Sequence, residues 1–115
     1  MAIGINHTQE KRLMHITSEG AHVLAAPERL VTDTRLDFRR TALEHVERTV
    51  QEALPRIYVD LSATREIDAS GLGVLVLIQK RARERMIATR LLHAGAEVRS
   101  MLLLTKLDYL FELED

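Results

Sequence analysis

The residues best suited to chemistry lie in one stretch, Asp60 to Gly73, with the sequence DLSATREIDASGLG. It combines carboxylates, hydroxyls and glycines, and Ser70 stands where we expect a helix to begin. Free backbone N–H groups at a helix start favour an added phosphate, and here they would belong to Gly71, Leu72 and Gly73. The two glycines would also leave space for a modifying enzyme to approach the backbone. From these residues alone, the simplest role of Ser70 is a helix N-cap, and a phosphate added to its hydroxyl would also be favoured at this position.

Other reaction chemistries have weaker signals in this chain. Asp60 and Asp68 could pair as acid and base, but no substrate pocket is indicated. A dinucleotide fingerprint fails because Val76 stands where its third glycine belongs, and no Lys-Ser/Thr pair follows to make a P-loop. The five histidines lack metal-ligand spacing, and the absence of cysteine excludes thiolate sites and disulfides. We therefore expect no enzyme activity, no cofactor and no metal.

Length and composition limit the class of protein. The 115 residues fit one domain, and 46% hydrophobic with 29% charged residues is an ordinary globular balance. A net charge of -1 argues against a partner that is nucleic acid. The longest apolar run, Val74 to Ile78, is too short to cross a membrane. Residues 1–12 resemble a loose leader without the apolar core of a signal peptide, so we expect a cytoplasmic protein.

The first half of the chain predicts strands followed by a helix. Residues 13–25 indicate two short strands around a turn at Glu19-Gly20, and residues 26–34 look irregular. An amphipathic helix is expected from about residue 35 to 54, where Pro55 ends it. Residues 26–34 offer possible caps for this helix in Thr32, Asp33 and Thr34.

The second half predicts alternating strands and helices. Residues 56–62 alternate as a strand, residues 63–69 form a loop, and a helix should follow from about 70 to 86. Within that helix, Val74 to Ile78 could be a strand in isolation, but the helix-forming residues after it favour a helical crossover. A strand near 88–94 and a last helix follow, and the final apolar residues could add an edge strand. The last helix is indicated by the spacing of Val98, Met101, Leu102 and Thr105. The expected fold class is α/β, a small mixed sheet with helices packed on it.

This order of motifs resembles the STAS domain, and within it the anti-sigma factor antagonists. The likeness rests on a strand ending in Asp-Leu-Ser, an Ile-Asp loop and Ala-Ser-Gly-Leu-Gly opening a helix. The later segment LLHAGAEVRSMLLLTKLDYLFEL matches as well, so the likeness extends over roughly residues 56–113. The segment AAPERLVTDTRLDF fits only loosely.

The resemblance implies a partner switch. In such antagonists, an anti-sigma factor that is also a serine kinase of the GHKL type phosphorylates the serine before the glycine. The unphosphorylated form binds that factor, the phosphorylated form does not, and a phosphatase reverses the change. By position the acceptor is Ser70 and the acidic residue is Asp68. Ala69 replaces a hydroxyl residue common in the family, which leaves Ser70 as the one hydroxyl between Thr64 and Thr89.

Around Ser70 we expect Asp60, Asp68, Gly71 and Gly73 to support the switch. The expected docking surface combines the loop from Ser62 to Glu66 with the helical segment from Leu72 to Ile78. Its residues would be Ser62, Thr64, Glu66, Leu72, Val74, Leu75 and Ile78. Apolar residues all around a helix can equally mean burial on both sides. The alternative function is a non-enzymatic STAS subunit or scaffold of a stress-sensing or lipid-transport complex.

Overall fold

The computed structural model describes residues 15–16 and 21–114 of the chain. The predicted leader and the turn at Glu19-Gly20 lie outside these residues. The elements are β1 (His15–Ile16), β2 (Ala21–Ala25), β3 (Arg29–Leu30), α2 (Arg35–Gln51), β4 (Arg56–Asp60), β5 (Glu66–Ile67), α3 (Ala69–Glu84), β6 (Ala88–Leu92), α4 (Ala96–Leu104), the 3-10 helix η1 (Asp108–Leu110) and β7 (Glu112–Glu114).

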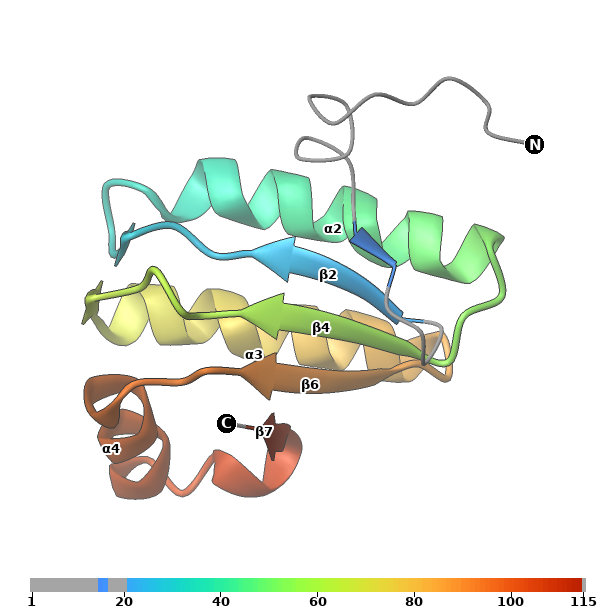
Figure 1. Cartoon of the computed structure of the whole chain (residues 1–115). Coiled ribbons are helices and arrows are strands. Elements are labelled where there is room, and N and C mark those ends of the chain that lie inside the picture. The colour runs from blue at the N-terminus through green and yellow to red at the C-terminus, as the bar shows by residue number, and fades with distance from the viewer. Residues whose placement is uncertain (1–14, 17–20, 115) are drawn as a thin grey trace.

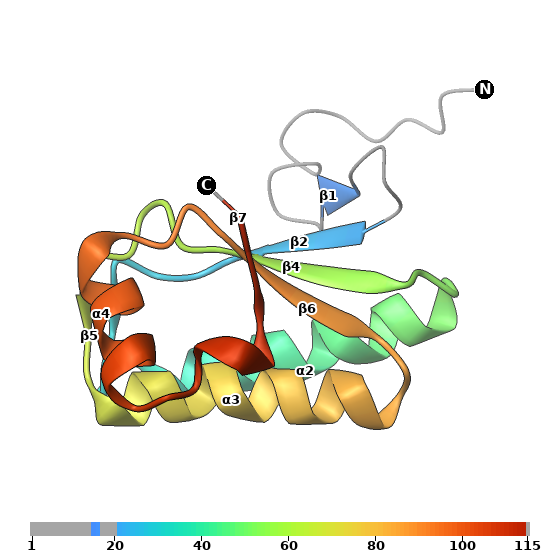
Figure 2. The same ribbon diagram turned by 90° about the horizontal axis from the view of Figure 1, so that it is seen from below.

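A mixed sheet of five strands forms the centre of the fold (Figure 1). Its strand order is β1-β2-β4-β6-β7, with β1 antiparallel to β2 and all other neighbours parallel. Parallel neighbours need crossover connections: α2 connects β2 with β4, α3 connects β4 with β6, and α4 with η1 connects β6 with β7. The helices α2 and α3 cover the same face of the sheet, as Figure 2 shows. The predicted α/β class and the edge strand at the end of the chain are confirmed.

The helix α2 follows its predicted pattern but ends earlier than expected. Its buried positions recur at helical spacing, namely Phe38, Ala42, Val46 and Thr49. The last turn ends at Gln51, because Ala53 adopts a positive φ of 56° and the Leu54 N–H donates to the Thr49 carbonyl. The chain thereby leaves the helix before Pro55 rather than at it.

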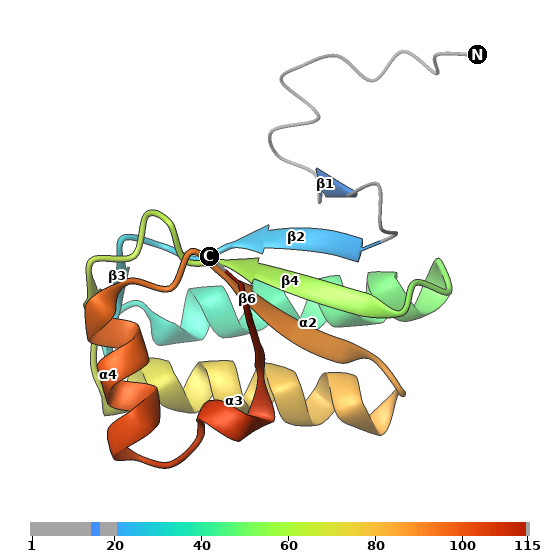
Figure 3. The ribbon, with the colours of Figure 1, turned by 60° about the horizontal axis from the view of Figure 1, so that its bottom comes forward.

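A second, two-stranded sheet was not predicted. It pairs β3 with β5 in parallel, so that Arg29 lies beside Glu66 and Leu30 beside Ile67. The Arg29 Nε also donates to the Glu66 carboxylate at 3.1 Å. The sequence indicated irregular chain and a loop at these positions, because strands of two residues are too short to show a periodic pattern. The small sheet lies at the N-terminal end of α3 (Figures 2 and 3).

The ambiguous run from Val74 to Ile78 is helical, as predicted, within α3. This helix packs against α2, the strand β6 and the small sheet. It therefore contributes buried side chains on most of its circumference, including Leu72, Leu75, Ile78 and Ala82. Burial on several sides explains why the run lacks a clear polar face.

Candidate functional site

The start of α3 is capped by Asp68. One carboxylate oxygen, Oδ1, accepts the backbone N–H of Gly71 at 2.9 Å, and the residue itself has extended backbone angles. The other oxygen, Oδ2, accepts the N–H of Thr32 at 3.0 Å. These donors hold the pKa of the Asp68 carboxyl below its usual value, chiefly through the Gly71 N–H. Asp68 is therefore a charged cap, and it joins α3 to the loop before α2.

Ser70 lies in the first turn of α3 and is half-buried. The alternative that it is only the N-cap does not hold, because Asp68 occupies that position. The Ser70 hydroxyl instead contacts the hydroxyl of Thr32, at 3.1 Å between the two oxygens. Thr32 also donates to Asp68 Oδ2 at 3.1 Å. Three side chains from two separate segments thus form one polar cluster.

Thr32 is the member of this cluster that the sequence prediction missed as a site residue. It lies between β3 and α2, 38 residues before Ser70. The pattern marked it only as a possible helix cap, and the observed cap of α2, Thr34, makes no side-chain cap bond. What brings Thr32 to Ser70 is the pairing of β3 with β5.

The expected role of free N–H groups at this helix start needs correction. The Gly71 N–H already donates to the Asp68 side chain, and the Leu72 N–H donates to the Asp68 carbonyl. The carboxylate of Asp68 thus occupies the place where a phosphate would have been received. An added phosphate on Ser70 would meet a negative charge beside it rather than an open set of donors.

The two glycines differ sharply in their surroundings. A Cβ on Gly71 would lie 1.9 Å from the Leu30 carbonyl oxygen, so this glycine permits close packing of α3 on the backbone of β3. The expectation that Gly71 leaves room for an enzyme is therefore wrong, because the backbone of Leu30 already fills that space. Gly73 is exposed, and nothing lies within 4 Å of its Cβ position. Of these two glycines, Gly73 is therefore the one that leaves space for an approaching partner.

The predicted apolar docking face of α3 is also corrected. Four of its expected contact residues are buried, with exposed fractions between 0% and 5%: Leu72, Val74, Leu75 and Ile78. They belong to the hydrophobic core, because α2, β6 and the small sheet pack against α3. A partner could reach them only by opening the fold.

The loop after β4 keeps part of its predicted role. Ser62 and Glu66 are exposed, whereas Thr64 is buried and its hydroxyl donates to the Pro27 carbonyl at 2.8 Å. Thr64 therefore fixes the loop instead of facing a partner. Asp60 accepts the Ser62 N–H at 2.9 Å and turns the chain out of β4. The Asp60 side chain thus contacts this loop, and the cluster of Thr32, Asp68 and Ser70 is built without it.

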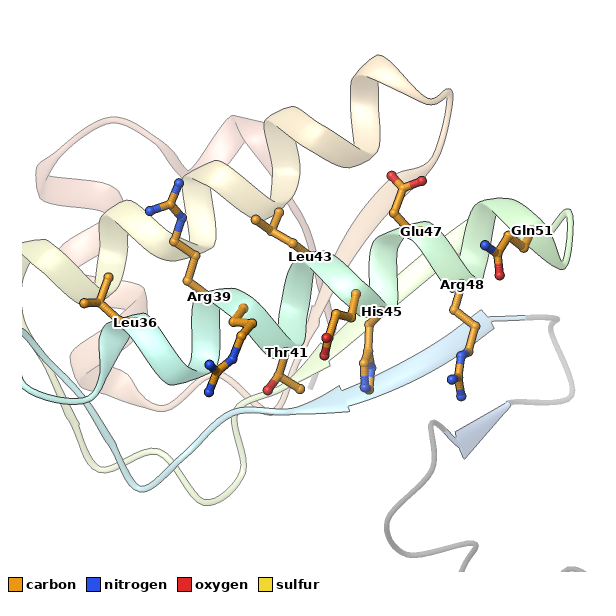
Figure 4. A pocket seen from close by; sticks show the side chains of 10 residues that line it. Leu36, Arg39, Thr41, Leu43, His45, Glu47, Arg48 and Gln51 are labelled. Atoms are coloured by element: carbon orange, nitrogen blue, oxygen red, sulfur yellow. The ribbon is translucent and has the colours of Figure 1, made fainter.

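A pocket runs along α2 (Figure 4), and none of the predicted site residues lines it. Its walls mix both charges, with Arg39 and Arg48 near Glu44 and Glu47. His45, on the same helix, is partly buried, and its pKa falls to about 4 because burial disfavours the charged imidazolium. In the described part of the chain, no group of three or more acidic or histidine side chains could hold a metal ion. Nor does any described helix have the length and apolar character needed to span a membrane.

Comparison with known proteins places this geometry in a family. A family model described as "Mlab, STAS domain" matches residues 14–112. None of the curated protein sequences matches the chain significantly.

Several solved structures share the fold. A candidate anti-sigma factor antagonist from Thermotoga maritima has a TM-score of 0.75 and 22% identity, over 90% of this chain and 85% of that one. SpoIIAA from Bacillus, in its phosphorylated form, has a TM-score of 0.64 and 15% identity, over 88% of each chain. A sulfate transporter family protein from Wolinella succinogenes has a TM-score of 0.70 and 11% identity, over 96% and 84%. The match of the family model over most of the chain shows that this protein belongs to the STAS domain family.

Proposed function

We propose that this protein is an anti-sigma factor antagonist, which binds a kinase-type anti-sigma factor when Ser70 is unphosphorylated and releases it when Ser70 is phosphorylated. The observation that carries the proposal is the position of Ser70, half-buried at the start of α3 and in contact with the Thr32–Asp68 pair. The likeness of the fold to SpoIIAA in its phosphorylated form supports the same reading. The protein would act as a non-catalytic module in the cytoplasm, with a GHKL-type serine kinase and a phosphatase as partners.

The docking surface that we now propose lies around Ser70 and leaves out the buried face of α3. Exposed residues there come from three segments: Ser62, Glu66, Ala69, Gly73 and Thr32. These residues are small or polar, and Gly73 leaves the helix backbone open to a partner. A partner on this surface would therefore lie directly over the hydroxyl that is modified.

The charge of a phosphate is large enough to reverse binding. Phosphoserine adds about -1.5 to -2 charges at neutral pH. At ~5 Å from a partner carboxylate, with an effective dielectric constant near 20, repulsion is on the order of 3 kcal/mol per charge pair. Since about 1.4 kcal/mol changes affinity tenfold, one phosphate can convert a tight complex into a negligible one.

The test is a pull-down from the lysate of the native host with four baits: the parent chain, Ser70→Asp, Ser70→Ala and Ser100→Asp. Ser100 is exposed on α4, outside the predicted surface, so its variant controls for an added charge elsewhere. We expect the parent, Ser70→Ala and Ser100→Asp to retain a GHKL-type kinase and Ser70→Asp to lose it by at least tenfold. Equal retention by Ser70→Asp would refute the switch.

A second candidate is a STAS subunit or scaffold of a transport assembly. It is favoured by the likeness to a sulfate transporter family protein, which the chain covers to 84% of its length. In this case all four baits would recover the same transport or scaffold complex. The outcome with Ser70→Asp therefore separates the two functions.

A further inference from the structure

The loop between β3 and α2 places Thr32 against both functional side chains of the site. The Thr32 hydroxyl oxygen lies 3.1 Å from Asp68 Oδ2 and 3.1 Å from Ser70 Oγ. Its backbone N–H donates to the same carboxylate oxygen at 3.0 Å. Thr32 is thus the bridge between the helix cap and the candidate acceptor.

The position of this loop is fixed on both sides. The hydroxyl of Thr34 donates to the Arg29 carbonyl at 2.6 Å and accepts the Val31 N–H at 3.1 Å. The Arg35 guanidinium donates to the Thr32 carbonyl at 2.9 Å. The contact between Thr32 and Ser70 therefore rests on an ordered backbone, not on the exposed side chain alone.

A hydroxyl has one proton and two acceptor lone pairs. Because a carboxylate is a stronger acceptor than a hydroxyl, the Thr32 proton is directed to Asp68. Thr32 then has a lone pair free to accept the Ser70 proton, which orients the Ser70 hydroxyl. After phosphorylation Ser70 Oγ has no proton to donate, and the new phosphoryl oxygens are strong acceptors. The Thr32 hydroxyl can rotate and donate to them, while its backbone N–H stays on Asp68.

We propose that Thr32 is a positioning residue of the switch: its hydroxyl orients Ser70 in the unmodified protein and donates to the phosphoryl group in the modified one. This inference rests on the proposed phosphorylation of Ser70 and adds a residue to that site. Without the Thr32 hydroxyl, the phosphate would lie beside the Asp68 carboxylate with one hydrogen-bond donor fewer. Its second pKa would then be higher.

The test uses the full chain with phosphoserine incorporated at position 70 during translation, so that no kinase is required. Phosphorus NMR follows the titration of the phosphate in the parent, Thr32→Val, Thr32→Ala and Thr32→Ser. A second Thr→Val change, at the exposed Thr41 of α2, serves as the control. We expect the second phosphate pKa to rise by roughly 0.5 to 1 pH unit in Thr32→Val and Thr32→Ala. Thr32→Ser and Thr41→Val should follow the parent.

In the unmodified chain, the side-chain rotamer of Ser70 gives a second readout. A merely structural role of Thr32 would not change this rotamer. The couplings between the α and β protons of Ser70 should indicate one rotamer in the parent and Thr32→Ser, and averaged rotamers in Thr32→Val. Titration curves and couplings that coincide in all variants would overturn the proposal. A failed search for a kinase partner would refute the proposed function but leave this result unchanged, so the two failures are distinguishable.

Discussion

Replacing Gly71 by alanine should destabilise the fold strongly, whereas the same change at Gly73 should stabilise it slightly. Both glycines lie in the first half of α3, only two residues apart. An added Cβ at Gly71 would lie 1.9 Å from the Leu30 oxygen, 2.7 Å from its carbonyl carbon and 2.9 Å from its Cγ. Ordinary contact begins at 3.4 Å, and two of the three atoms belong to the backbone. Relief therefore requires α3 and β3 to move apart.

The pair of variants separates this clash from helix propensity. Alanine is better than glycine in a helix by about 0.8–1 kcal/mol, and both variants receive this gain. Forcing extra volume into a packed region costs about 1–3 kcal/mol, and more where backbone must shift. We expect Gly71→Ala to lose about 2 kcal/mol or more, and Gly73→Ala to gain roughly 0.5–1 kcal/mol. The difference, about 3 kcal/mol, measures the clash alone.

Urea unfolding at 25 °C, followed by circular dichroism at 222 nm, gives both values. With a slope of about 1.5 kcal/mol per M, the midpoint of Gly71→Ala should fall by more than about 1 M, and that of Gly73→Ala should rise by roughly 0.5 M. A domain of this size is stable by about 5–15 kcal/mol, so Gly71→Ala should still fold and be measurable. A midpoint for Gly71→Ala at or above that of the parent would refute the close approach of α3 to Leu30.

Two further changes test the electrostatics of the fold. Asp68→Ala should lower the urea midpoint more than Asp68→Asn, since asparagine also caps helices well. The deficit of Asp68→Ala should shrink as the pH falls below about 4, where the unfolded carboxyl is protonated. Equal midpoints for the two variants would contradict a capping role. The pKa of His45 is about 4 in the folded chain and 6.5 in an unfolded peptide. Between these pH values the unfolded state binds more protons than the folded state. The parent should therefore lose stability as the pH falls from about 6.5 to 4. Full burial would make the loss about 3.4 kcal/mol, but screening at this partly exposed side chain reduces it to roughly 1 kcal/mol. His45→Gln should remove that slope in unfolding measured across the range, and an unchanged slope would assign it to other groups.

The long elements of the fold were predictable because their patterns are local. The helix from residue 70 onward was placed to within two residues at each end, since the apolar run continues into strong helix formers. The strand at Arg56–Asp60 was found as well, although it ends two residues earlier than expected. The cause is Asp60, whose side chain accepts the Ser62 N–H and turns the chain.

Local sequence patterns could not predict the two-residue strands, nor which side chains are buried against neighbouring elements. A continuous apolar run such as Val74–Ile78 shows that a helix is buried but not which neighbours cover it. The docking face on α3 was wrong for this reason, because packing from several elements decides exposure. Likewise, Gly71 and Gly73 look equivalent in the sequence, and only the approach of Leu30 distinguishes them.

The cluster at the start of α3 would hold a phosphate on Ser70 by few contacts of its own, which suits a switch that acts on a bound partner. A helix start ordinarily attracts an anion, and the Asp68 carboxylate already fills that role by accepting the Gly71 N–H. Among the described residues, the hydroxyl that contacts Ser70 belongs to Thr32, which also contacts Asp68. A phosphate on Ser70 would therefore be held by the Thr32 hydroxyl rather than by the helix start, and its remaining charge would face a bound partner. We infer that such a site favours repulsion of a partner over rearrangement of the fold.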